Sequence, residues 1–504
     1  LAEDLIQSNN FEEAQASIFD TIHDSLDGLN YLHKYDSLLL KAVCSFGYLG
    51  WILYSLTFVL QYYTDLYGNF HVSSTFCTSG IFGLFAAGLT IFLAAKGSPV
   101  QYFIYTAFTL GFWHQIIQSR KSLFALVGKL FSNVKSAPYI LGYIAGLEAL
   151  VLTFFKRELL AVINMVAGLA LLVRYRGVHR ALTTIWFVVC TCMSAFPFLS
   201  PIKLANEKLY SAGIVAIVLT SVFSYKVVST NKAQKSTMQF LSKTLIIFVS
   251  GYLSKNSDSQ LKQKLGLPLW NQNAAWAILS YAVLSPLLVP GKKAAMERFL
   301  DLFMTFAPAY ILLSISYEPL FYACFGLQLA MWILLESSSG KGQGGLSFEH
   351  LWVCFGFLFF VNLAFFGTGN MASVSSFTLE SVYRFITVFS PFSMAALLIL
   401  KLLIPFGLLS AAFGLLARKS GTSAVSLILL VLATTDIMTL NFFHLVKDHG
   451  SWLEIGTSIS HFVIASSLII FTLILAGLSN ILLSGVQVNE LDQNVAFSLY
   501  RKTQ

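Results

Sequence analysis

The stretch from Lys447 to His461 carries the densest group of chemically useful side chains in the sequence, Lys-Asp-His-Gly-Ser-Trp-Leu-Glu-Ile-Gly-Thr-Ser-Ile-Ser-His. Its cation, acids, imidazoles and hydroxyls could bind a phosphate or a sugar, and its glycines allow close backbone approach to a ligand. The alternative is a plain interfacial loop, because tryptophan suits the headgroup layer of a membrane. The candidate binding residues in this stretch are Lys447, Asp448, Ser451, Trp452 and His461.

A second stretch, Phe365-Phe-Gly-Thr-Gly-Asn-Met-Ala-Ser-Val-Ser-Ser-Phe377, is similarly rich in small hydrogen-bonding residues. Residues 367–372 fit a dinucleotide fingerprint by letter, but they follow an apolar run and no βαβ unit surrounds them, so we reject that function. Backbone donors that face a lipid phosphate or a glycan suit this context better. The candidate binding residues here are Gly367, Thr368, Gly369, Asn370, Ser373 and Ser376.

Polar side chains also occur inside the apolar runs. Asp436, Asn441 and His444 share one face of a helix at ~100° per residue. Polar groups in hydrocarbon are costly unless they are paired or hydrated, so this face should meet the bundle interior or a cavity. Counting from the helix ends places Lys401 and Asp436 at the same depth, roughly 20 Å. We therefore expect Lys401 and Asp436 to face each other in a buried polar network with Asn441 and His444. A purely structural network and a lipid-headgroup groove are both open interpretations.

No residue in the sequence is assigned to catalysis or to a metal. His444, His449 and His461 lie on different elements without compact ligand spacing. No Ser/His/Asp, paired-carboxylate or zinc constellation is recognisable. The six cysteines lie mostly inside apolar runs, so we expect free thiols rather than a disulfide framework.

The elements that must position these residues are membrane helices. The chain is 56% hydrophobic and 11% charged, which is too apolar for a soluble protein of 504 residues. Its apolar runs are continuous rather than alternating, so the sequence predicts an all-α polytopic transmembrane bundle of about 14–15 helices. The expected segments are 38–62, 78–95, 100–117, 139–155, 159–173, 181–198, 209–229, 238–253, 276–289, 299–314, 319–335, 350–366, 391–416, 423–446 and 458–484.

Three parts are expected along the chain. Residues 1–36 show apolar side chains at helical spacing and predict a short amphipathic helix that Gly28 ends or bends. Residues 37–485 form the polytopic domain, and 486–504 form a C-terminal cytosolic tail. The chain begins at Leu1 without a methionine or a signal peptide, so we expect further protein before it.

The net charge of +8 does not indicate nucleic-acid binding, because the basic residues are spread singly or in pairs over the loops. That spread is typical of residues that set membrane topology. The positive-inside rule then places the N-terminus and both motif stretches on the lumenal side and the C-terminus in the cytosol.

The two motif stretches together resemble the membrane region of the glycosylphosphatidylinositol (GPI) ethanolamine phosphate transferases. Phe-Phe-Gly-Thr-Gly at 365–369 is similar to a core shared by that family. The string that begins at Lys447 resembles the member that modifies the first mannose. The resemblance extends more weakly from about Phe11 to about Leu483.

The resemblance implies an enzyme of the endoplasmic reticulum membrane that moves phosphoethanolamine from phosphatidylethanolamine to the first mannose of a GPI precursor glycolipid. It implies a lumenal N-terminal catalytic domain with two zinc ions, absent from this chain, so no cofactor is expected here. The expected partners are the bilayer, the two lipids and that catalytic domain. The membrane part would position the lipids. The alternatives are a multi-span lipid transporter or scramblase, which often shows inverted repeats, and an inert membrane scaffold.

The topology yields a direct prediction. Single cysteines at Asn370 and Ser451 should react with a membrane-impermeant reagent only after sealed microsomes are opened. Cysteines at Gln343 and near the C-terminus should react without opening. Protection of position 343 in sealed microsomes would contradict the arrangement.

Overall fold

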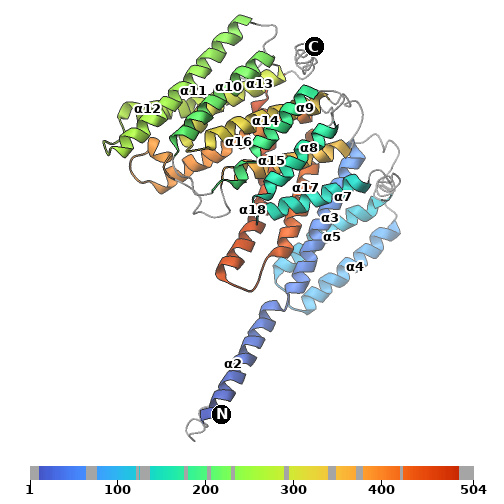
Figure 1. Cartoon of the computed structure of the whole chain (residues 1–504). Helices are drawn as coiled ribbons and strands as arrows, with labels where there is room; N and C mark the ends of the chain where they lie inside the picture. The colour runs from blue at the N-terminus through green and yellow to red at the C-terminus, as the bar shows by residue number, and fades with distance from the viewer. Residues whose placement is uncertain are drawn as a thin grey trace. The chain divides into compact units, whose positions relative to one another are not determined.

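The computed structural model describes residues 11–63, 76–120, 124, 137–174, 180–200, 206–228, 233–288, 294–338, 348–369, 379–419 and 424–486. Within these residues the regular elements are α-helices and short 3₁₀ helices (Figure 1). The all-α prediction is therefore confirmed. A continuous apolar run in lipid must satisfy its backbone groups internally, and a helix does so within one segment.

The chain divides into two compact units, residues 1–58 with 69–127 and residues 59–68 with 128–504. The first unit contains α2 (Phe11–Lys34), most of α3 (Ser37–Tyr63), α4 (Phe76–Ala95) and α5 (Val100–Gln118). The second unit contains α7 (Ala137–Thr153), α8 (Leu159–Arg174), α9 (Arg180–Met193), η3 (Phe196–Phe198), α10 (Glu207–Val228), α11 (Ala233–Lys262), α12 (Leu269–Leu288), α13 (Ala295–Leu313), α14 (Glu318–Ser338), α15 (Phe348–Phe366), η5 (Val382–Arg384), α16 (Pro391–Lys419), α17 (Ala424–Leu445) and α18 (Trp452–Leu482).

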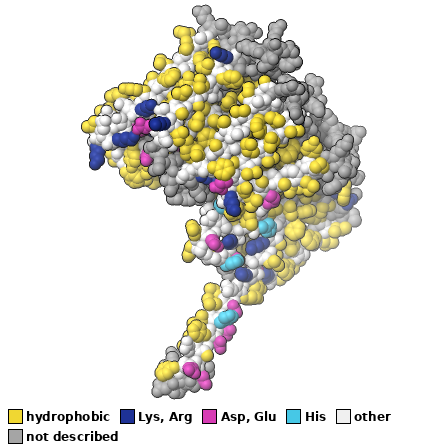
Figure 2. All heavy atoms as spheres, viewed as in Figure 1, with side chains coloured by type: hydrophobic (Ala, Val, Ile, Leu, Met, Phe, Trp, Pro, Cys, Tyr) yellow, Lys and Arg dark blue, Asp and Glu magenta, His cyan; other side chains and the backbone are white. Residues whose placement is uncertain are grey.

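Each predicted apolar segment coincides with one of these helices from α3 to α18. Among the described residues, six stretches can cross a membrane by length and composition: Phe11–Val59, Ala181–Phe198, Glu318–Glu336, Pro391–Lys419, Val425–Leu445 and Trp452–Leu482. Figure 2 shows apolar side chains over much of the visible surface, which suits contact with lipid. The predicted boundaries at residues 36 and 485 stay predictions.

The amphipathic N-terminal helix is present as α2. Gly28 does not end it, because α2 continues to Lys34, and a bend at Gly28 stays a prediction. In the same unit, the α3 and α5 helices contact each other through Trp113, whose Nε1 donates to the carbonyl of Phe46 at 3.0 Å. Lys96 and Asp36 form an ion pair between the chain segments that flank α4 and α3. The hydrogen bond that Lys96 donates to Asp36 raises the pKa of Lys96.

The core of the second unit is α13, which packs against α10, α11, α12, α14 and α16. Nearly all its side chains are buried, including Tyr310 and Phe303. The α10 helix approaches the start of α14 closely at Gly213. A Cβ added to Gly213 would lie 2.6 Å from the amide nitrogen of Leu320 and 2.7 Å from Cβ of Pro319. Only glycine permits that approach.

This contact predicts the effect of an added methyl group. Gly213→Ala should destabilise the protein by about 1–3 kcal/mol, because the neighbouring backbone must move. Gly477→Ala on α18 is the matched control, since nothing lies within 4 Å of its added Cβ. The midpoint of thermal unfolding in detergent measures both. Equal midpoints for the two variants would show that α10 and α14 are not in this contact.

Candidate functional site

The stretch from Lys447 to His461 forms a short turn followed by the first turns of α18. Ser451 caps α18, because its hydroxyl accepts a hydrogen bond from the amide of Glu454 at 3.2 Å. Gly450 has a φ of +117°, a conformation that side chains other than glycine rarely adopt. Of the candidate binding residues, Lys447 pairs with Glu454 at 3.1 Å and Asp448 contacts His449 at 2.6 Å.

Exposure separates the other two candidates in this stretch. Trp452 is 91% exposed, as expected for an anchor in the headgroup layer. His461 is only 3% exposed and packs against the rings of Phe154, Phe155 and Phe442. Its Nδ1 atom has no hydrogen-bond partner among the described residues. His461 is therefore placed in an aromatic cluster rather than on a surface.

The second stretch is described only as far as Gly369, so the candidates Asn370, Ser373 and Ser376 lie outside the described residues. The amide of Gly367 donates to the carbonyl of Leu363, and the amide of Gly369 donates to that of Phe366. These bonds end α15, and the φ of Gly369 is +77°. The two amides therefore donate to carbonyls at the end of α15 rather than to a ligand.

Gly367 and Thr368 are held against the turn between α13 and α14. A Cβ on Gly367 would lie 2.6 Å from the ring of Phe321. The hydroxyl of Tyr317 reaches the carbonyl of Thr368 at 3.5 Å, and Thr368 is buried. Burial raises the pKa of Tyr317 to about 12, so this phenol stays a neutral donor.

The aromatic cluster brings the two motif stretches together. The ring of Phe154 lies 5.2 Å from that of Phe366 and 5.7 Å from that of His461, measured between centroids. Phe366 directly precedes Gly367, so the end of α15 and the first turns of α18 share one neighbour at the end of α7.

The buried charge Lys401 has a partner that the sequence analysis did not name. Its Nζ lies 2.7 Å from Oε2 of Glu318, the first residue of α14. Glu318 also accepts a hydrogen bond from the amide of Ile315 at 2.8 Å. The sequence analysis expected Asp436 as the partner. Asp436 is buried too, and its position facing Lys401 stays a prediction.

The remaining members of the expected buried network lie nearer the surface. Both carboxylate oxygens of Glu148 on α7 lie 2.7 Å from the side-chain nitrogen of Asn441. Asn441 is half-buried and Glu148 is exposed. His444 is exposed, and its place in the network stays a prediction. It lies one residue before the end of α17, where the helix reaches the surface.

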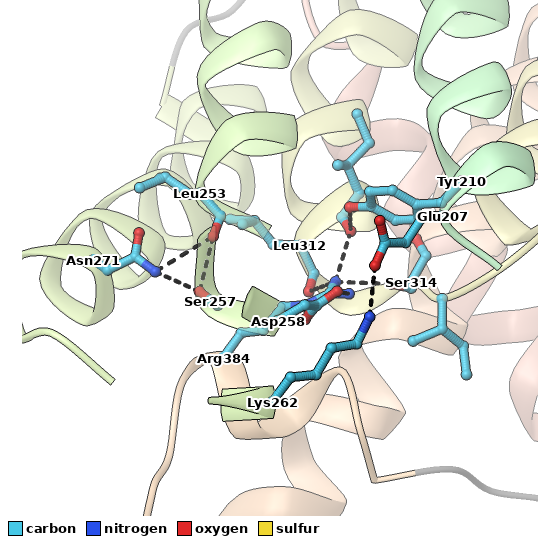
Figure 3. Close-up of polar contacts among 12 residues, drawn as sticks. Glu207, Tyr210, Leu253, Ser257, Asp258, Lys262, Asn271, Leu312, Ser314 and Arg384 are labelled. Atoms are coloured by element: carbon cyan, nitrogen blue, oxygen red, sulfur yellow. Dashed lines mark hydrogen bonds and ion pairs between the residues drawn. The ribbon is translucent and has the colours of Figure 1, made fainter. Parts of the chain in front are cut away.

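A second buried cation, Arg384, contacts the turn between α13 and α14 (Figure 3). Its guanidinium contacts both carboxylate oxygens of Asp258 at 2.9 Å. It also donates to the carbonyls of Ile311 at 3.3 Å, Leu312 at 2.9 Å and Ser314 at 2.8 Å. Arg384 therefore ties the end of α11 to the end of α13.

Sequence reasoning missed Arg384 and treated it only as a loop charge that reports topology. One signal was available, since Val-Tyr-Arg-Phe-Ile at 382–386 places a lone arginine among apolar residues. An arginine in such surroundings is buried only when it is paired. The acid that pairs with it, Asp258, is 126 positions away in the chain.

A polar cavity of about 590 Å³ opens beside Arg384. A second ion pair crosses its wall, from Nζ of Lys262 to Oε1 of Glu207 at 2.5 Å, and both side chains are exposed. The walls come from the start of α10, the end of α11, the α13–α14 turn and the 380–384 segment. The lining residues are Asn206, Glu207, Tyr210, Lys255, Asp258, Ser259, Leu261, Lys262, Gln263, Ile315, Ser316, Glu380, Tyr383 and Arg384.

The described residues contain no group of three or more His, Cys, Asp or Glu side chains that could hold a metal ion. The zinc ions implied by the resemblance therefore have no fitting ligand set in this part of the chain. We assign no chemical step to them.

Comparison with known proteins identifies the relatives of this chain. A family model described as Phosphatidylinositolglycan class N (PIG-N) matches residues 27–451. Proteins named GPI ethanolamine phosphate transferase 1 are similar along nearly the whole chain. The one from Neurospora crassa is 36% identical over 96% of this chain and 54% of its own length. The one from Chaetomium globosum is 34% identical over 96% and 59%, and the human one is 31% identical over 95% and 55%. This chain thus spans little more than half the length of these relatives. No solved structure matches it.

The pair between Lys401 and Glu318 predicts an asymmetric cost of substitution. Lys401→Met should destabilise the protein by about 3–5 kcal/mol, because it leaves a buried carboxylate without its cation. Adding Glu318→Gln should restore much of that loss, since glutamine is neutral and still accepts from the amide of Ile315. Lys447→Met is the exposed-pair control and should cost at most about 1 kcal/mol. Thermal unfolding in detergent measures all three. A double variant less stable than Lys401→Met alone would contradict the pairing.

Proposed function

Because the chain belongs to the PIG-N family, we propose that it is the membrane part of an enzyme that transfers phosphoethanolamine to the first mannose of a GPI precursor. The proposal takes phosphatidylethanolamine as the donor and the endoplasmic reticulum as the compartment. The observation that carries it is the match over residues 27–451, together with relatives that share the printed name GPI ethanolamine phosphate transferase 1 along 95–96% of this chain.

The role that we propose for this part is to hold both lipid substrates at one height. Reactions between two lipids gain from fixed positions, because positioning removes translational and rotational freedom before the chemical step. A helix of 22 residues such as α17, whose stretch Val425–Leu445 can cross a membrane by length and composition, spans about 33 Å at ~1.5 Å per residue. That length matches the ~30 Å hydrocarbon core, so the helix ends lie at the level of the lipid headgroups.

The arrangement of polar groups supports this role. The α13–α14 turn, the end of α15 and the 379–390 segment meet through Tyr317, Thr368 and Arg384. The polar cavity opens at the same end. We propose that this end faces the lumen, as the distribution of basic residues predicts. Lys447, which is exposed, is our candidate for contact with a donor phosphate.

Lys447 provides the test, with the complete protein that the gene encodes expressed in cells that lack the corresponding transferase. Transfer is measured in microsomes by mass spectrometry of GPI precursors with and without phosphoethanolamine on the first mannose. Lys447→Gln should raise KM for the lipid donor about three- to tenfold with little change in kcat, because a contact made equally in ground and transition states affects binding only.

Glu454→Gln is the matched control, because it breaks the same ion pair and keeps the cation. It should leave KM unchanged. An equal rise in KM for both variants would show that the ion pair matters rather than a phosphate contact. Failure of the complete wild-type protein to restore the modified precursor would overturn the proposed transfer and favour a transporter or a scaffold.

A further inference from the structure

Two charged side chains that line the polar cavity, Lys255 and Glu380, take no part in its two ion pairs. Arg384 pairs with Asp258 and Lys262 pairs with Glu207. Lys255 on α11 and Glu380 at the start of the 380–384 segment are both exposed and line the cavity. Lys255 is attracted to Glu207, and Glu380 is attracted to Lys262, but neither lies within ion-pair distance of another described residue. The cavity therefore offers a guest one unpaired cation and one unpaired anion from two different walls.

The neutral lining adds hydrogen-bonding groups to these charges. Ser259, Gln263 and Tyr383 contribute a hydroxyl, an amide and a phenol. A ligand that pairs with these lining residues carries a negative and a positive group a few bonds apart and has polar atoms between them. The cavity of about 590 Å³ lies within the usual range for small-molecule sites, ~300–1,000 Å³.

The position of the cavity narrows the class of guest. It is lined by Ile315 and Ser316, in the turn just before α14. The stretch Glu318–Glu336 of α14 can cross a membrane by length and composition, so its start and the cavity beside it lie at the headgroup level of a bilayer. The small zwitterions at that level are phosphate esters of amino alcohols. Carboxylates and amides suit a primary ammonium with its three N–H donors, whereas a quaternary ammonium is recognised by aromatic cages.

We propose that this cavity binds a phosphoethanolamine group, with its phosphate at Lys255 and its ammonium at Glu380. The group could be carried by a membrane lipid or by a glycan, and both present the same chemistry. The proposal rests on the proposed function for the choice of ligand, and it adds a site that neither motif stretch contains. Lys262 and Glu207 line the same wall and can re-pair with the guest.

Arg384 supplies the fixed floor of this site. Its hydrogen bonds to Asp258 and to three carbonyls hold the 380–384 segment against α11 and α13. Glu380 is only four residues before Arg384, so its backbone is held near α11 while its side chain stays exposed. Substitutions at Lys255 and Glu380 should therefore change binding without disturbing the fold.

The test measures binding by calorimetry with the 504-residue chain purified in a maltoside detergent, which carries neither phosphate nor amine. The probes are glycerophosphoethanolamine, glycerophosphocholine and inorganic phosphate. Glycerophosphoethanolamine should bind more tightly than the other two. Lys255→Gln should weaken both glycerophosphoethanolamine and inorganic phosphate about three- to tenfold. Glu380→Gln should weaken glycerophosphoethanolamine by a similar factor but strengthen inorganic phosphate, because it removes a repelling charge.

The controls are Lys208→Gln and Glu158→Gln, which neutralise exposed residues outside the cavity lining. They should leave all binding constants unchanged. Equal effects of Glu380→Gln and Glu158→Gln, or equal affinity for the ethanolamine and choline probes, would overturn the proposal. The proposal would also be overturned if none of the three probes bound.

Two more probes identify the carrier of the group. Tighter binding of dihexanoyl phosphatidylethanolamine than of free phosphoethanolamine assigns the site to a membrane lipid, and the reverse order assigns it to a glycan-linked group. These measurements do not depend on turnover. If the cavity binds the probes as expected but the complete protein does not transfer phosphoethanolamine, only the proposed function is overturned. If the complete protein transfers phosphoethanolamine but the cavity binds no probe, only the proposed site is overturned.

Discussion

The structure of the larger unit depends on the hydrogen bonds that the last backbone carbonyls of α13 accept. The last carbonyls of a helix lack partners within that helix, and burying them unpaired costs free energy. The α13 helix is buried along almost its whole length, so its end cannot rely on water. Arg384 donates to the carbonyls of Ile311, Leu312 and Ser314, and the hydroxyl of Tyr210 also donates to that of Ile311 at 2.8 Å. Two distant parts of the chain, α10 and η5, are therefore fixed by one set of carbonyls at the end of α13.

The same requirement explains the other polar contacts inside this unit. Gln328 on α14 donates to the amide oxygen of Asn164 on α8 at 2.6 Å, and Asn164 donates to the carbonyl of Cys190 on α9 at 2.8 Å. Lys401 and Glu318 join α16 to α14 in the same way. Apolar packing in lipid gives little preference for one neighbour over another. A buried polar group that needs one particular partner supplies that preference, so these contacts select which helices are neighbours.

The helices were predictable from the sequence, and their polar partners were not. Hydropathy finds a helix such as α16 because one helix satisfies its own backbone. Hydropathy also shows that Lys401 needs a partner. Counting residues from the helix ends compares depths only between helices whose ends are assumed to lie at the same membrane surface. This counting indicated Asp436, because α17 follows α16 directly in the chain. Glu318 lies just before the predicted segment 319–335, whereas it is the first residue of α14 and fully buried. Arg384 was missed for the same reason, since its partner Asp258 is remote in sequence.

The polar cavity combines a fixed floor with free charges at its rim, and this difference follows from burial. Arg384 is 2% exposed, and its three guanidinium nitrogens donate to Asp258 and to the carbonyls at the end of α13. It cannot turn towards a ligand without breaking those hydrogen bonds. Lys255 and Glu380 are exposed and have no ion pair with a described residue to break, so they exchange only water for a ligand. A binding site at a membrane surface needs both properties. Its backbone must hold one height, and its charges must exchange water for a headgroup at low cost. The buried arginine provides the first property, and its distance from the rim leaves the second to Lys255 and Glu380.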